Sequence, residues 1–160
     1  MMTSPDVGIR IPIGRDEFEI SCDATRLDRQ AIHDFLSTKS YWARGVPFDV
    51  VNRSIDHSLN FGAYTNETGV VHQVGYARVI SDSATFAFIR DVFVIESHRG
   101  MGIGASLVRA VLAHPDLGGL RRIMLATKDA HGLYERFGFV PLGRPDRFLA
   151  IEHSSKELYS

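Results

Sequence analysis

A glycine-rich segment, Arg99–Gly104, carries the clearest chemical signal in the chain and reads R-x-x-G-x-G. It follows Phe86–Ile95, an apolar run rich in aromatic and β-branched residues that predicts a buried strand. It leads into Ile103, Leu107 and Val111, whose spacing predicts a helix. A strand that turns through glycines into a helix leaves backbone N–H groups at the positive end of the helix dipole. The segment therefore predicts a binding site for a diphosphate.

Strands and helices alternate on both sides of this segment. Two strands, Ala84–Ile95 and Ile123–Thr127, enclose the helix and should form a right-handed parallel crossover. The turn Asn66–Gly69 predicts an antiparallel hairpin before them. The other expected elements are a strand at Glu17–Cys22, a helix capped by Asp23 or Thr25 and ending near Thr38, a helix at Phe48–His57, strands at Leu59–Tyr64 and Val70–Ile80, helices at Met101–Ala113 and Asp129–Phe137 with Gly138 as the stop, and closing strands at Phe139–Leu142 and Phe148–Glu152.

This order predicts an α/β (α+β) domain over residues 17–153, in which helices pack on a mixed sheet. Residues 1–16 are expected to form a flexible arm, because they contain two prolines and two glycines. Residues 154–160 are expected to be a polar, frayed tail.

Composition narrows the function classes. The 160 residues are 44% hydrophobic and carry a formal net charge of −1, so no basic nucleic-acid surface is expected. No apolar run is long enough to span a bilayer, and no membrane partner is expected. Cys22 is the single cysteine, which predicts neither a disulfide nor a thiolate metal site and favours a cytoplasmic location.

Three motifs together resemble the GNAT acetyltransferase superfamily: the Arg99–Gly104 loop, the Asp91–Val94 strand before it, and the L-Y-x-x-F-G-F segment Leu133–Phe139. Their order and spacing cover roughly Phe18 to Ile151. The resemblance implies a mostly antiparallel sheet, splayed between the fourth and fifth strands, with helices on both faces. It also implies acetyl coenzyme A as co-substrate, direct acetyl transfer to a primary amine of a small molecule or peptide, and room for a homodimer.

The resemblance assigns the coenzyme to two parts of the chain. The strand should hydrogen-bond the pantetheine arm, and the glycine loop should bind the pyrophosphate. The expected contacts are Val92, Phe93 and Val94 on the strand, Arg99, Gly100, Met101, Gly102, Ile103, Gly104 and Ala105 in the loop, and Thr127, Asp129, His131 and Tyr134 beyond it.

Tyr134 matches the tyrosine that commonly acts as general acid in the superfamily. Its hydroxyl, with an ordinary pKa of about 10, can donate a hydrogen bond to the departing thiolate. Asp91 is the nearest carboxylate and is expected to take the amine proton through water, with His72 and Tyr76 as alternatives. Asp129, at the start of the helix, also suits an N-cap.

The acceptor is expected between the first two helices and the hairpin, with Tyr41, Trp42, Arg44 and Tyr76 as its contacts. Arg90 stands where the diamine acetyltransferases resemble one another in carrying Glu, which argues against a polyamine acceptor. Charged Arg90 and Asp91 interrupt an apolar strand, which predicts a bulge or splay there.

Several alternatives remain open. A non-catalytic acyl-CoA sensor would also need the glycine loop, and so would a transferase for a longer acyl donor. A dinucleotide fold is disfavoured, because the loop begins with Arg99 and no repeated strand–helix series follows it. A Walker loop is excluded by the missing Gly-Lys-Ser/Thr.

Overall fold

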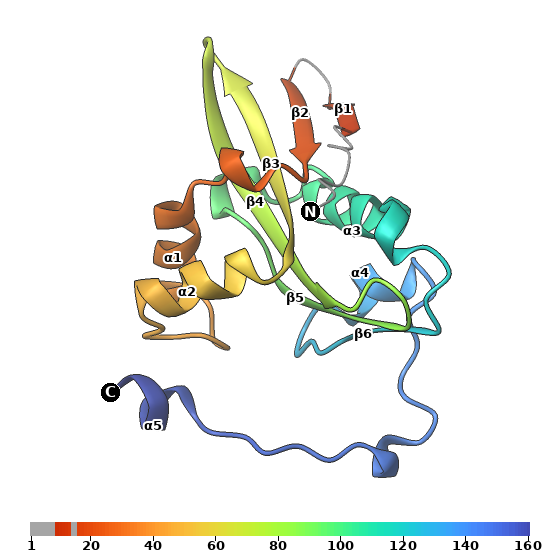
Figure 1. Cartoon of the computed structure of the whole chain (residues 1–160). Helices are drawn as coiled ribbons and strands as arrows, with labels where there is room; N and C mark the ends of the chain where they lie inside the picture. The colour runs from red at the N-terminus through yellow and green to blue at the C-terminus, as the bar shows by residue number, and fades with distance from the viewer. Residues whose placement is uncertain (1–8, 14–15) are drawn as a thin grey trace.

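The computed structural model describes residues 9–13 and 16–160. One mixed sheet of six strands, ordered β1-β2-β3-β4-β5-β6, forms its centre (Figure 1). All neighbours are antiparallel except β5 and β6, which are parallel. The strands are β1 (Ile9–Ile13), β2 (Asp16–Ser21), β3 (Leu59–Glu67), β4 (Val70–Ser81), β5 (Phe86–Val94) and β6 (Arg122–Leu125).

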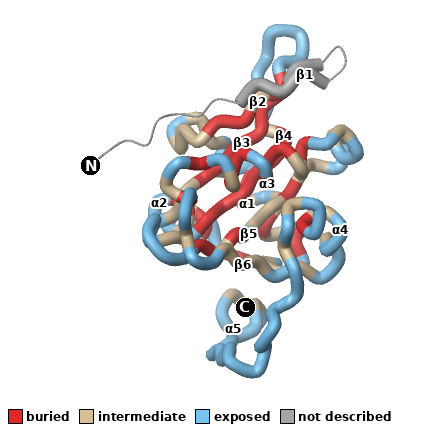
Figure 2. Tube along the Cα trace, turned by 90° about the vertical axis from the view of Figure 1, so that its right-hand side faces the viewer, coloured by how far each residue is buried: buried red, intermediate tan, exposed pale blue. Residues whose placement is uncertain are grey.

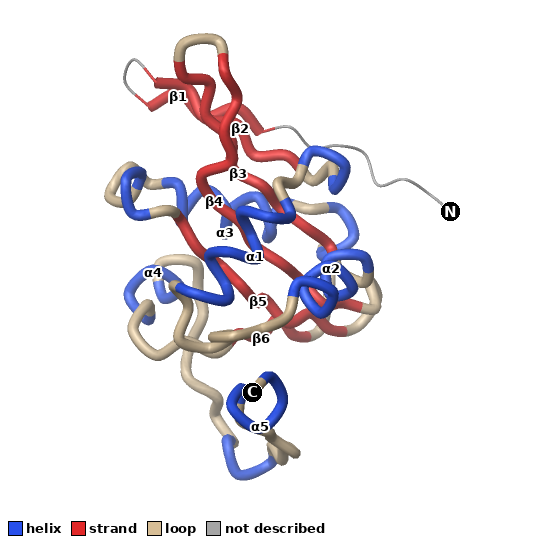
Figure 3. The backbone as a smooth tube through the Cα atoms, turned by 90° about the vertical axis from the view of Figure 1, so that its left-hand side faces the viewer, coloured by secondary structure: helices blue, strands red, loops and turns tan. Residues whose placement is uncertain are grey.

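Helices cover both faces of this sheet, which confirms the expected fold class (Figure 3). One hydrophobic cluster lies between the sheet and α3, centred on Leu107, Val74 and Ile89. A second lies between α1, α2 and the sheet, centred on Ile32, Val51 and Phe93. Buried residues follow the central strands from both sides (Figure 2). The α-helices are α1 (Arg29–Thr38), α2 (Phe48–Asp56), α3 (Ile103–Ala113), α4 (His131–Glu135) and α5 (Ser155–Tyr159).

β5 and β6 pair only at their beginnings. Their register runs from Phe86 opposite Arg122 to Ile89 opposite Leu125, where the pairing ends. β5 continues for five more residues, to Val94, with β4 as its one strand partner in the described part of the chain. The expected splay therefore falls between β5 and β6, the fourth and fifth strands when counting starts at Asp16.

A bulge interrupts β5 at the start of this open stretch. Tyr76 faces Phe93, whereas Arg78 faces Arg90, so the single residue Ala77 stands opposite two residues of β5. Asp91 has a φ of 52° there, in the left-handed region that Asp tolerates better than most residues. The bulge expected at this charged dipeptide is confirmed.

Two expectations about the beginning of the chain are wrong. Residues 9–13 form β1, an edge strand paired with β2, instead of part of a loose arm. Its alternation of Ile9, Ile11 and Ile13 suits a strand, and Pro12 is tolerated on an edge. Residues 1–8 lie outside the described part. Helix α1 is capped by Asp28, which accepts from the Ala31 amide, whereas Asp23 caps a short 3₁₀ helix at Ala24–Arg26.

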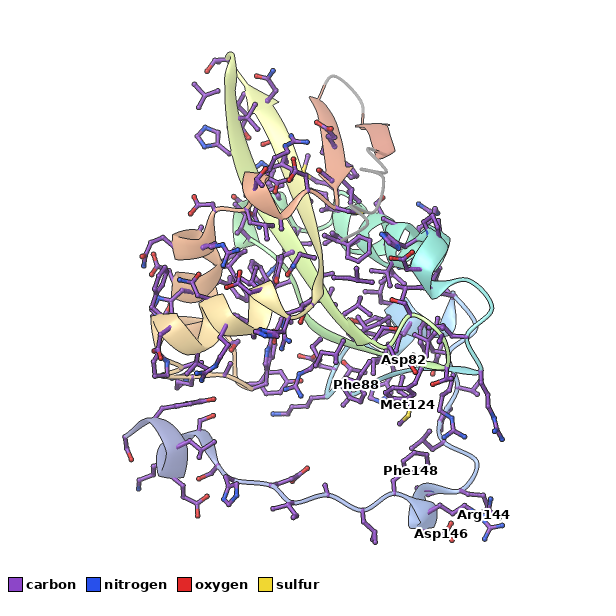
Figure 4. All side chains as sticks on the ribbon, in the orientation of Figure 1. Asp82, Phe88, Met124, Arg144, Asp146 and Phe148 are labelled. Atoms are coloured by element: carbon purple, nitrogen blue, oxygen red, sulfur yellow. The ribbon has the colours of Figure 1, made fainter. Side chains whose placement is uncertain are left out.

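The two expected closing strands are also wrong. Residues 139–142 and 148–152 run as irregular chain, because Pro141, Gly143 and Pro145 interrupt any ladder. This segment passes below the edge of the sheet, where Phe148 lies beneath Met124 (Figure 4) and 5.3 Å from the Arg122 guanidinium. The tail beyond it forms α5, stabilised by a capping box between Ser154 and Glu157. The final residues are therefore helical where a frayed tail was expected.

Candidate active site

A cavity of about 530 Å³ opens where β5 and β6 diverge. Four parts of the chain line it: the bulged stretch of β5, the connection from β6 to α4, the aromatic loop after α1, and the C-terminal segment. It brings together seven of the expected site residues: Tyr41, Trp42, Asp91, Val92, Thr127, Asp129 and Tyr134.

The open edge of β5 presents backbone groups toward this gap. The Ile95 amide donates to Val74 of β4 over 2.9 Å, so the polar backbone groups of Val94 turn to the opposite, open edge. The Val94 carbonyl accepts from Arg99 Nε there, at 3.1 Å. An extended ligand can therefore hydrogen-bond to β5 in the manner of a neighbouring strand.

The glycine segment adopts the expected turn. Gly100 and Gly102 have φ values of 79° and 82°, in the left-handed region that favours glycine. Gly102 is the N-cap of α3, and no side chain bonds to the first turn of that helix. The amides of Ile103, Gly104 and Ala105 therefore remain available to an anion, in agreement with a diphosphate site.

Gly104 separates folding from binding in this turn. A Cβ there would meet Leu133 and Val94 side chains at 3.8 and 3.9 Å, which are ordinary contacts. Gly104→Ala should therefore raise the free energy of unfolding by about 0.5–1 kcal/mol, since alanine favours a helix. It should weaken coenzyme A binding by about 10- to 100-fold if a phosphate lies against these amides.

Calorimetric titration with coenzyme A and thermal unfolding measure the two effects. Gly132→Ala is the matched control, because Gly132 lies in α4 and a Cβ there would also meet no atom within 4 Å. Equal affinities for the wild type and Gly104→Ala would contradict a diphosphate at this helix.

Tyr134 lies between two cavities on the side of α4 that faces β6. It lines the main cavity and also a neighbouring one of about 290 Å³ that His131 helps to form. Its ring packs edge-on against Phe139, with centroids 5.9 Å apart. Burial, and to a smaller extent the neighbouring Tyr41, raises the pKa of Tyr134 from 10.0 to about 12. The hydroxyl is therefore a proton donor throughout the physiological range.

Asp91 is held on both sides. Its Oδ2 accepts from Arg78 Nε over 2.7 Å, and its Oδ1 accepts from Trp42 Nε1 over 2.9 Å. The Asp91 and Arg78 side chains are 7% and 11% exposed. Arg78 also donates to Ser58. This network ties the β5 bulge to β4 and to the aromatic loop, so Asp91 has a clear structural role at the site.

The aromatic loop closes the cavity on its far side. The Tyr41 hydroxyl accepts from the Lys128 amide over 3.2 Å, which links the loop after α1 to the connection after β6. Thr127 Oγ1 accepts from the Ala130 amide and so shapes the same connection. Asp129 is no N-cap: Ala130 holds that position without a side-chain bond, and Asp129 lines the cavity instead.

Some expected site residues lie elsewhere. Tyr76 is fully buried in the second cluster and donates to Asn60, while His72 is exposed near the hairpin tip. Arg44 is exposed and lines none of the described cavities. Phe93 turns its ring toward α1, where it stacks on Phe35 at 3.8 Å, so it can offer a ligand on the open edge nothing from that ring.

Residues 29–139 match the acetyltransferase (GNAT) family. The chain belongs to this family. The match runs from α1 to the end of the L-Y-x-x-F-G-F segment, and so includes the glycine turn, the bulge and Tyr134. The activity class of this GNAT protein is therefore that of an acetyltransferase.

Named relatives agree with this assignment. The GNAT chain is 31% identical over 139 residues to the Gibberella zeae protein named "Putative acetyltransferase FG08082", covering 75% of this chain and 77% of that protein. A GNAT-family crystal structure from Xanthomonas campestris pv. campestris has a TM-score of 0.83 at 49% identity, over 89% of this chain and 96% of that one. A structure from Deinococcus radiodurans R1, at 18% identity and a TM-score of 0.63 over 91% and 93% of the two chains, shows the shared fold.

The sequence missed three charged residues of the GNAT cavity: Arg90, Lys128 and Glu152. Glu152 was assigned to a closing strand, and its place in the cavity follows from the path of the irregular segment beyond α4. Arg90 was noted for its departure from diamine acetyltransferases, but nothing in the sequence indicated its neighbours. In the described residues, no group of His, Cys, Asp or Glu could hold a metal ion, and no helix is long and apolar enough to cross a membrane.

Proposed function

We propose that this GNAT protein is an acetyl-CoA-dependent N-acetyltransferase that acts on a primary amine. The observation that carries the proposal is the arrangement of three features along one gap in the sheet. The uncapped N-terminus of α3, the open edge of β5 and the buried Tyr134 hydroxyl lie on the same divergence of β5 and β6. These are the features needed to hold a diphosphate, an extended amide-bearing arm and a leaving thiolate, respectively.

Acetyl-CoA would supply the activated acetyl group as a thioester. The residues present fit it, because the amides of Ile103, Gly104 and Ala105 have no capping side chain and Gly104 leaves space beside them. Arg99 would add a positive charge at the same turn. Val92 and Val94 would hold the arm on the open edge of β5 and direct the reacting carbon toward Tyr134.

The amine must be neutral before it attacks. An alkyl ammonium with a pKa near 10 costs about 4 kcal/mol to deprotonate at pH 7, so a nearby carboxylate helps. Both oxygens of Asp91 already accept hydrogen bonds. Glu152 lines the same cavity, and its carboxylate accepts no hydrogen bond from the described residues. We therefore assign the proton to Glu152 and the positioning of the bulge to Asp91.

A thiol-release assay with acetyl-CoA and a panel of primary amines tests the proposal. Turnover is expected with at least one amine, and Glu152→Gln should lower kcat/KM for it by about 100-fold, a usual loss for a general base. Asp49→Asn, an exposed change on α2 outside the described cavities, is the control and should change nothing. Coenzyme A binding without turnover on any amine would favour the non-catalytic sensor instead.

A further inference from the structure

A second cavity of about 230 Å³ adjoins the first one. The two cavities share Trp42, Arg90 and Asp91, which stand where they meet. The α1 and α2 side of the second cavity is apolar, and Leu158 and Tyr159 of α5 close it. Figure 1 shows α5 below α2, on the side of the molecule where the C-terminal segment returns. Its apolar wall consists of Leu36, Trp42, Ala43, Val46, Val50 and Val51.

The charges around this cavity do not cancel. Arg78 is neutralised by its ion pair with Asp91. Arg90 forms no ion pair with the described residues, and its guanidinium lies 5.8 Å from the Phe88 ring centroid. His153 is the other titratable group of the lining. Lys128 belongs to the first cavity alone, where its amine lies over Tyr41. One uncompensated positive charge, that of Arg90, therefore stands at the junction.

We infer that the acceptor is a small amino carboxylate with an apolar side chain, an inference that rests on the proposed function. Its side chain would occupy the second cavity, its carboxylate would pair with Arg90, and its amine would reach the first cavity. Guanidinium groups bind carboxylates through two parallel hydrogen bonds, which fixes the acceptor's orientation. A volume of 230 Å³ equals about eight water molecules, so it suits a group the size of an amino-acid side chain.

The chemistry is balanced by groups already named. A C–N bond forms between the acceptor nitrogen and the acetyl carbonyl carbon, and the C–S bond of the thioester breaks. The proton lost by the nitrogen goes to Glu152, and Tyr134 donates a hydrogen bond to the departing thiolate. Arg90 makes no bond to the reacting atoms, so it determines specificity and is not a catalytic residue.

Matched acceptors separate the carboxylate from the rest of the molecule. Leucine, leucinamide and isopentylamine share one side chain, but only leucine has a carboxylate. We expect the wild type to favour leucine over isopentylamine in kcat/KM by about 10- to 100-fold. Arg90→Gln should reduce that ratio to near one, and Arg90→Lys should restore part of it. The intrinsic reactivities of the amines cancel when ratios are compared between variants.

Arg53→Gln is the control, because it removes an equal charge from the exposed surface of α2, outside the described cavities. An unchanged ratio in Arg90→Gln, or a wild type that prefers leucinamide, would overturn the inference and leave the proposed function standing. If no amine is acetylated, the proposed function fails. Calorimetry with leucine and isopentylamine then tests Arg90 directly, and equal affinity of leucine for wild type and Arg90→Gln would overturn the inference.

Discussion

Replacing Tyr134 with phenylalanine should lower kcat by about 10²- to 10⁴-fold, the usual contribution of a positioned proton donor. The hydroxyl makes no hydrogen bond within the described residues, and the ring keeps its edge-on contact with Phe139. The free energy of unfolding and the Kd for coenzyme A should therefore change little. Thiol release, thermal unfolding and calorimetry measure the three quantities. Unchanged turnover with the best acceptor would show that Tyr134 is not the donor.

The same side chain predicts the alkaline end of the pH profile. Because burial raises the pKa of Tyr134 to about 12, the hydroxyl should keep its proton well above pH 10. The neutral form is the one favoured by folding, so its contribution to stability is present below pH 10 and is lost only as the pH rises toward 12. A loss of activity between pH 9 and about 10 that disappears in Tyr134→Phe would contradict this assignment.

Breaking the ion pair beneath the site should have the largest effect on stability. Arg78→Met leaves the Asp91 carboxylate buried without its cation, and it should lower the free energy of unfolding by about 3–5 kcal/mol. Asp91→Asn in the same chain removes the stranded charge, tolerates the left-handed backbone, and keeps an oxygen for Trp42. The double variant should recover most of the loss. Urea unfolding of all four members of the double-mutant cycle measures the coupling.

The double variant also separates the two roles considered for Asp91. If Asp91 only positions the bulge, the refolded double variant should retain kcat within about tenfold, with Glu152 still taking the proton. A folded double variant with no detectable turnover would instead identify Asp91 as the proton acceptor. Additive losses of stability in the two single variants would show that the pair is not coupled.

Local patterns were sufficient for the elements of the coenzyme site. The Arg99–Gly104 segment predicted a turn into a helix, and Gly100 and Gly102 adopt the left-handed geometry that such a turn needs. The bulge at Arg90–Asp91 followed from two charges in an apolar strand. Each of these features depends on residues adjacent in the chain, whose steric and hydrogen-bonding preferences are local.

The partners of the charged groups required the assembled fold. Asp91 meets Arg78 because the bulge shifts the register of β5 against β4, and Trp42 reaches the same carboxylate from a loop 49 residues away. Tyr76 became a core residue for the same reason: helices cover both faces of its strand.

Glu152 entered the cavity, and Arg90 stayed without an ion pair, through the path of the C-terminal segment, which local preference predicted as strand. The amino-acid sequence thus specified where a coenzyme could be held, since that depends on backbone geometry over a few residues. Which carboxylate remains free and which cation faces the acceptor depends on contacts between distant segments, and these exist only once the sheet, its bulge and its covering layers have packed together.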